Sequence, residues 1–83
     1  MLENSQIKNA ILKVVENAEV HIINPQNDGL HFEAIVISEY FEGKGLVEQH
    51  QVVMQGLSEL FSSSLHALSL KTYTPEEWIK VKT

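Results

Sequence analysis

The chain has 83 residues, of which 43% are hydrophobic and 20% charged, a composition typical of one small folded domain. It contains no cysteine, which excludes disulfides and thiolate metal sites built from this chain alone. Six lysines, no arginine and eleven acidic residues give a formal net charge of −5, which disfavours general binding to nucleic acid backbones. The acidic start lacks the pattern of a signal peptide and no apolar run is long enough for a membrane span, so we expect a cytoplasmic protein without a membrane partner.

The N-terminal segment is predicted to form a helix that Asn4 or Ser5 caps. Its apolar residues recur at the spacing of one helical face, namely Ile7, Ile11, Val14 and Val15. After Asn17 the period changes to the alternation of a short strand over residues 19–23.

A turn and a second strand follow. Residues 24–29 are rich in turn formers, and Asp28-Gly29 suits the positive-φ positions of a hairpin turn. In the strand predicted over residues 31–38, one face carries Phe32, Ala34 and Val36, and the other carries Glu33, Ile35 and Ile37. We expect the first face to pack on helices, and the apolar end of the second face to be either partly covered or open to a partner.

Helical periodicity returns after the glycine-bearing connection at residues 40–45. The predicted stripe consists of Leu46, His50, Val53, Leu57 and Leu60, joined by Val47, Met54 and Phe61. Gly56 lies inside this stripe and costs about 1 kcal/mol relative to alanine in a helix interior. The segment is therefore either one long helix or two consecutive helices that meet at Gly56.

A third strand and a last helix complete the chain. In the strand predicted over residues 65–73, one face carries His66, Leu68 and Leu70, and the other carries Leu65, Ala67, Ser69 and Lys71. Thr74 is the predicted N-cap of the final helix, with Pro75 at its first position, Glu77 completing a capping box and Trp78 as its anchor.

This order predicts an α+β fold in which helices cover a three-stranded sheet, with residues 1–83 as a single domain. No nucleotide-binding, hydrolase or metalloprotease motif is present, so we expect no enzymatic activity and no catalytic residue. We interpret Gly43-Lys44-Gly45 as a helix-entry turn and the serines at 62–64 as a helix terminator.

The four histidines are the remaining candidates for chemistry. His21 alternates with apolar residues on a strand, and His50 lies within a helical stripe, so both favour a structural interpretation. His31 begins a strand just after the turn, which makes its imidazole either an ordinary edge residue or an accessible group. His66 opens the third strand, and a neutral imidazole is a ligand for iron and zinc. One histidine cannot hold a metal alone.

Two ordered motifs resemble the BolA family, in the form of its short bacterial members. They are the run Phe41-Glu-Gly-Lys-Gly-Leu-Val-Glu-Gln-His50 and the run Leu65-His-Ala-Leu-Ser-Leu-Lys-Thr-Tyr-Thr-Pro-Glu-Glu-Trp78. The segment from His31 to Gly43 is also similar to the family's second strand and the connection after it, so the resemblance extends over nearly the whole chain. It implies a class II KH-like fold with the element order α-β-β-α(α)-β-α.

The resemblance also implies a function. BolA-like proteins are partners of monothiol glutaredoxins and share with them a two-iron two-sulfur cluster, for which the glutaredoxin and glutathione supply thiolates. The position that supplies a histidine in the family matches His66, and the implied glutaredoxin surface is the exposed face of the third strand with the last helix. Many members have a second ligand in the loop between the first two strands, where this chain has neither Cys nor His. His31 is the nearest substitute, and we expect a more labile cluster, held from this chain by His66 alone or by His66 with His31.

The alternative function implied by the resemblance is that of a DNA-binding transcriptional regulator. The family's basic residues on either side of its helical histidine are Gln49 and Gln51 here, which removes phosphate contacts. DNA binding would then depend on Lys44, Lys71, Lys80 and Lys82, if these converge in space. A third class, an interaction module without metal, and a weak homodimer of the free chain are left open by the sequence.

Overall fold

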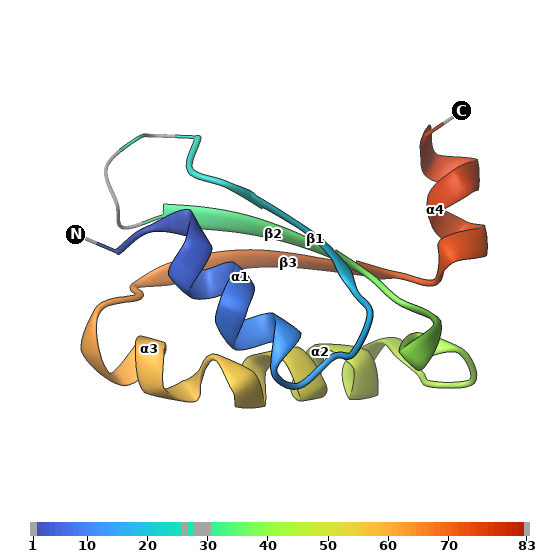
Figure 1. Ribbon diagram of the computed structural model, residues 1–83, viewed down its shortest axis with the longest axis horizontal. Coiled ribbons are helices and arrows are strands. Elements are labelled where there is room, and N and C mark those ends of the chain that lie inside the picture. Colours follow the sequence, from blue (N-terminus) through green and yellow to red (C-terminus); the bar gives the residue numbers. More distant parts are fainter. Residues whose placement is uncertain (1, 26, 28–30, 83) are drawn as a thin grey trace.

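The computed structural model describes residues 2–25, 27 and 31–82 and shows the predicted order of elements (Figure 1). The helices are α1 (Asn4–Leu12), the short 3₁₀ helix η1 (Glu39–Phe41), α2 (Leu46–Gly56), α3 (Ser58–Ser63) and α4 (Pro75–Lys82). The strands are β1 (Glu19–Ile23), β2 (His31–Ile37) and β3 (Ala67–Tyr73). Within these described ranges, no helix has the length and apolarity that crossing a membrane requires.

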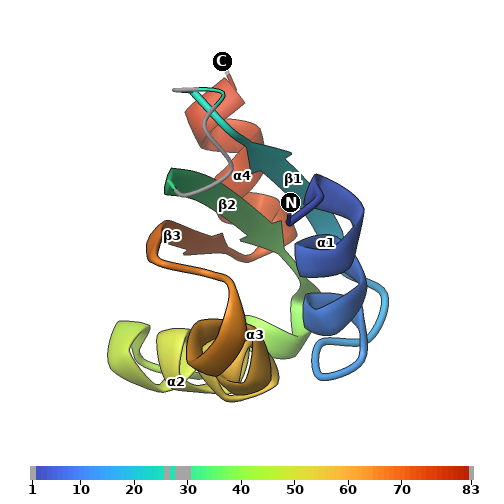
Figure 2. The ribbon, with the colours of Figure 1, turned by 90° about the vertical axis from the view of Figure 1, so that its left-hand side faces the viewer.

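The three strands form one mixed sheet with the order β1-β2-β3. Strands β1 and β2 are antiparallel, whereas β2 and β3 are parallel and joined through α2 and α3. Helices α1, α2 and α3 lie on one side of the sheet, and α4 stands on the other side at one end (Figures 1 and 2). This arrangement confirms the predicted α+β, class II KH-like architecture.

The core lies between the sheet and helices α1 to α3. As predicted, Phe32, Ala34 and Val36 are buried on the face that packs on these helices. The second face of β2 is partly covered, since Ile37 is buried beside α4 whereas Ile35 is only half-buried. The largest fully buried side chains are Phe41, Ile7, Ile11, Leu57, Val15, Val36 and Val53.

The predicted cap of α1 is wrong by one or two residues. Glu3 is the N-cap, with extended backbone, and forms a capping box in which its own N–H donates to Oε1 of Gln6 at 2.8 Å. Asn4 and Ser5 are already helical, because the reciprocal bonds of Glu3 and Gln6 satisfy the first free N–H groups. The helix ends at Leu12, so Val14 and Val15 lie in the turn after it, although Val15 remains fully buried.

The predicted stripe of α2 is also partly wrong. Leu46 is 62% exposed, Val47 71% and Met54 37%, whereas Gln49 is buried together with Val53. The buried face therefore runs through residues 49, 53 and 57, because the amide of Gln49 finds hydrogen-bond partners inside the protein.

The helical segment divides into two helices, one of the two predicted alternatives. The break follows Gly56, which packs against the turn after α1: a Cβ at this position would lie 2.6 Å from Cγ2 of Val14. Glycine is therefore required here by the close approach of two segments, and this requirement offsets its cost in a helix.

Strand β3 begins at Ala67, two residues later than predicted, and Leu65 and His66 precede it. Leu65 is buried in the core and not on the face of Ser69 and Lys71, because the chain has not yet adopted the alternation of a strand there. From Ala67 on the predicted faces are correct, since Leu68 and Leu70 pair with core residues of β2.

The capping box of α4 is confirmed. The N–H of Glu77 donates to Oγ1 of Thr74 at 3.2 Å, and the N–H of Thr74 donates to Oε1 of Glu77 at 2.8 Å. Trp78 anchors the helix through ring contacts with Tyr73 at 5.3 Å and His21 at 5.9 Å between centroids. The predicted hairpin turn at Asp28-Gly29 lies outside the described residues.

Candidate functional site

His66 is presented on the surface between two fixed neighbours. Before it, Leu65 is buried in the core, and its N–H donates to the carbonyl oxygen of Leu60 at 2.7 Å. After it, Ala67 opens β3 in register with His31. The imidazole of His66 is exposed, so a solvent-facing nitrogen ligand stands on a segment whose backbone is held from both sides.

His31 lies at the same end of the sheet. It is the first residue of β2, its side chain is exposed, and its Cα partner across the parallel pair is Ala67. His66 directly precedes Ala67 and therefore lies diagonally across from His31, just before β3 begins. The two histidines expected as metal ligands lie 35 residues apart in the sequence, yet the parallel pairing of β2 and β3 brings them to the same end of the sheet.

At this end of the sheet, the two exposed histidines offer imidazole nitrogens as potential metal donors. Within residues 2–25, 27 and 31–82, no group of three His, Asp or Glu side chains is arranged to hold a metal ion, and the sequence has no cysteine. Iron–sulfur clusters are held mainly by thiolates, with imidazole replacing thiolate at some irons. His66 and His31 can therefore supply nitrogen ligands, while the remaining ligands would have to come from another molecule.

The other two histidines, His21 and His50, pack against neighbouring parts of the protein. Nε2 of His21 lies 2.5 Å from Oε2 of Glu19, and the ring packs beside Trp78. His50 is half-buried on α2, and its Nε2 is buried with no hydrogen-bond partner among the described residues. His21 lies in the middle of β1 opposite Ile35, and His50 lies on α2, so neither is at the end of the sheet where His31 and His66 lie.

The four lysines proposed for DNA do not converge on one surface. Lys44 and Lys80 line one groove, but Glu42, Glu76 and Glu77 line it with them. Nζ of Lys44 lies over the ring of Tyr40 at 4.5 Å, and Nζ of Lys80 lies 3.9 Å from Oε1 of Glu76. The groove therefore carries more negative than positive charge.

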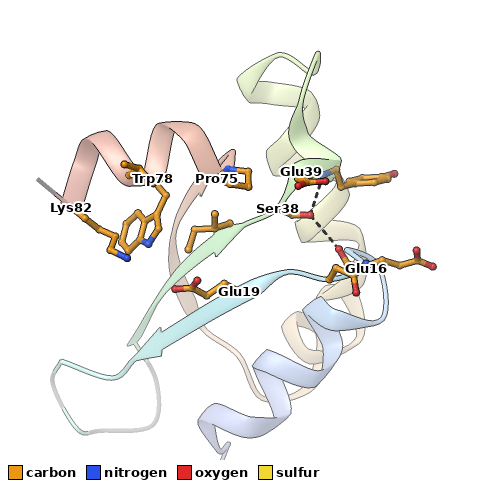
Figure 3. A pocket seen from close by; sticks show the side chains of 11 residues that line it. Glu16, Glu19, Ser38, Glu39, Pro75, Trp78 and Lys82 are labelled. Atoms are coloured by element: carbon orange, nitrogen blue, oxygen red, sulfur yellow. Dashed lines mark hydrogen bonds between the residues drawn. The ribbon is translucent and has the colours of Figure 1, made fainter.

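The remaining two lysines lie elsewhere. Lys71 is exposed on β3, and Lys82 lines a separate groove between α4 and the ends of β1 and β2 (Figure 3). The carboxylates of Glu16, Glu19 and Glu39 line that groove as well. Lys44, Lys80 and Lys82 therefore lie beside carboxylates, in two separate grooves.

Gln49 has a role that the sequence did not reveal. Its side chain donates from Nε2 to the carbonyl oxygens of Lys44 at 2.8 Å and Phe41 at 3.4 Å, and its Oε1 accepts from Oγ1 of Thr72 at 2.7 Å. The amide thus connects the loop before α2 to β3. Only Gln51 of these two glutamines faces solvent, whereas Gln49 is buried with its amide hydrogen-bonded inside the protein. A polar residue four positions before buried Val53 was the available signal.

A small mixed sheet whose parallel strands are joined through two helices, with one helix before the first strand, defines the class II KH-like fold. The sequence matches the family model of BolA-like proteins over residues 4–77. The chain belongs to the BolA family.

Relatives and solved structures agree with this assignment. The acid stress protein IbaG of Escherichia coli K12 is 35% identical over 80 residues, which cover 95% of this chain and 92% of the relative. The DNA-binding transcriptional regulator BolA of Vibrio cholerae is 37% identical over 67 residues, which cover 81% of this chain and 62% of the relative. The structure of a bolA protein homologue from Coxiella burnetii superimposes with a TM-score of 0.81 at 38% identity and covers 95% of this chain and 99% of that chain.

Proposed function

We propose that this BolA-family protein is an accessory in iron–sulfur cluster handling or iron regulation, and that it supplies His66 to a two-iron two-sulfur cluster shared with a monothiol glutaredoxin. The observation that carries this proposal is the exposed imidazole of His66, held between buried Leu65 and strand residue Ala67. Because the backbone on both sides is already held, only the side chain of His66 has to be ordered when it binds a metal.

The chemistry of the chain supports a mixed ligand set. Without cysteine, it can offer a soft cluster only nitrogen or oxygen atoms, so the thiolates would come from the glutaredoxin and glutathione. Imidazole in place of thiolate raises the reduction potential of such a cluster. His31 stands on the adjacent strand, where it would serve as a second ligand or as a neighbour of the cluster.

The proposed glutaredoxin surface is the exposed face of β3 together with α4. Ser69 and Lys71 of this face are exposed, and α4 exposes Ile79 at 62% and Val81 at 55%. Exposed apolar side chains beside polar ones are common in surfaces that bind other proteins.

Co-purification with a monothiol glutaredoxin, glutathione and iron tests the proposal through the visible absorption and circular dichroism of the cluster. His66→Ala should remove most of the signal, and His31→Ala should weaken or alter it. Lys13→Gln is the control, since Lys13 is exposed on the helix-covered side of the sheet, away from the site and from α4, and should leave the spectrum unchanged. An unchanged cluster in His66→Ala would contradict the ligand role. No cluster absorption for the wild type would favour an interaction module without metal.

DNA binding is the second candidate, because a relative with 37% identity is named as a DNA-binding transcriptional regulator. The carboxylates around Lys44 and Lys80 argue against it in this chain. Salt-sensitive binding to a promoter fragment that Lys44→Glu abolishes would reverse this ranking.

A further inference from the structure

A groove lies along the edge of the sheet that β1 forms, opposite the edge formed by β3. This groove, of about 640 Å³, runs between the first turns of α1 and the open edge of β1, and its outer wall includes Trp78 of α4. From α1 it is lined by Asn4, Ser5 and Lys8. From the sheet it is lined by Val20, His21, Ile22, Ile23 and Ile35. This groove lies apart from His66 and plays no part in the proposed cluster site.

The backbone of β1 leaves hydrogen-bonding groups directed at this groove. Nδ2 of Asn4 donates to the carbonyl oxygen of Ile22 at 3.3 Å, which shows that this carbonyl points away from β2. Backbone groups alternate in direction along an antiparallel strand, so the N–H and carbonyl of Val20 and the N–H of Ile22 point the same way. Among the residues that the structure describes, none forms a hydrogen bond with these three groups.

The side chains of the groove define what it can bind. Ile23 is 45% exposed and lies near half-buried Ile35 and Trp78, which together form an apolar wall. Lys8 is exposed, and no carboxylate within the described ranges pairs with it. His21, the other ionisable residue of the lining, is already paired with Glu19. A lysine without a partner beside an apolar wall, in a chain of net charge −5, complements a carboxylate attached to an apolar ligand.

We propose that this groove binds an extended segment of another protein, which adds a strand to β1 and places an acidic side chain against Lys8. An added strand would satisfy the three free backbone groups of Val20 and Ile22. Its alternate side chains would pack against Ile23 and Trp78 on the outer face, and the intervening ones would face α1 and Lys8. A free apolar carboxylate would use the wall and Lys8 but would leave the backbone groups unpaired.

The proposal is tested with a small set of acetylated and amidated six-residue peptides, in which valine and threonine alternate around one glutamate at varied positions. Binding is followed by the backbone amide shifts of the labelled protein. At least one peptide should shift Val20, Ile22 and Lys8 with a Kd at or below about 1 mM. The same peptide should fail to bind when the amides that face β1 are N-methylated, because the edge hydrogen bonds are lost.

The contact between Lys8 and the peptide glutamate is tested with a double-mutant cycle. Replacing the peptide glutamate by glutamine, or Lys8→Gln in the protein, should each weaken binding about two- to fivefold, and the two changes together should cost no more than one alone. Lys13→Gln is the control, since Lys13 is exposed after α1 but lies outside this groove, and should have no effect. The proposal would be overturned by no peptide binding at that concentration, by equal binding of N-methylated peptides, or by decanoate binding in preference to every peptide. Concentration-dependent dimerisation through β1 would assign the groove to a second copy instead and would equally contradict it.

Discussion

The two faces of the sheet have different properties. The face under α1, α2 and α3 borders the core, in which side chains such as Phe41, Ile7 and Leu57 are fully buried. The face beside α4 is only partly covered, since α4 has no buried residue and touches the sheet through Trp78. The first face supplies most of the burial that stabilises an 83-residue chain, and the second leaves grooves and exposed apolar groups for partners. Substitutions on the helix-covered side should therefore lower stability, whereas substitutions on the side of α4 should mainly change the binding of partners.

The largest loss of stability is expected from Phe41→Ala on the helix-covered side. Phe41 is the largest fully buried side chain, and its removal leaves a cavity that costs about 3–5 kcal/mol in the free energy of unfolding. Chemical denaturation should show a lower midpoint or a chain unfolded in water. Tyr40→Ala is the neighbouring control, because Tyr40 is 46% exposed and should cost clearly less. Equal losses would contradict the assignment of the core to this side.

A smaller loss is expected from Gln49→Leu, which tests the polar contact within the same side. The substitution leaves Oγ1 of Thr72 and the carbonyl oxygen of Lys44 without their partner, at a cost of about 1–3 kcal/mol. Adding Thr72→Val should recover part of that cost, since it removes one unpaired buried group. Gln51→Leu at the exposed position should change stability by less than about 0.5 kcal/mol. A Gln49→Leu variant as stable as the wild type would show that the amide does not tie the loop to β3.

The smallest effect is expected from Thr74→Ala on the side of α4. Loss of the side-chain cap should cost about 1 kcal/mol locally and increase amide hydrogen exchange in α4. The core amides of β2 should exchange as in the wild type, because few contacts connect α4 to the helix-covered side. Faster exchange throughout the sheet would show that α4 belongs to the same cooperative unit as the core.

Local patterns predicted much of this fold. The period of two located β1 and the two faces of β2, and the Thr74–Glu77 box located the start of α4. The face of α2 was not predictable in the same way, because the internal hydrogen bonds of Gln49 outweigh the apolar periodicity of Leu46 and Val47. Residue type and local spacing do not distinguish a buried glutamine such as Gln49 from an exposed one such as Gln51. Only the packed structure shows which of the two finds hydrogen-bond partners inside the protein.

The candidate site, like the fold, was predictable from the sequence only in part. The resemblance to BolA proteins indicated His66, but the position of His31 beside it depends on the parallel register of β2 and β3, which no local pattern contains. The surroundings of Lys44 and Lys80 depend likewise on where α4 stands relative to the loop before α2. Both are long-range properties of the fold, and both bear directly on the choice between a cluster partner and a DNA-binding protein.

The reduction potential of the shared cluster in a His66→Cys variant tests the ligand role of His66 most directly. Cysteine keeps a ligand at the position but exchanges neutral imidazole for thiolate, and clusters with only thiolate ligands have lower potentials than those with imidazole. With a monothiol glutaredoxin and glutathione present, the variant should retain a cluster whose potential is lower than that of the wild-type complex. A cluster of unchanged potential and unchanged spectrum would show that residue 66 does not bind iron, and would contradict the proposed function.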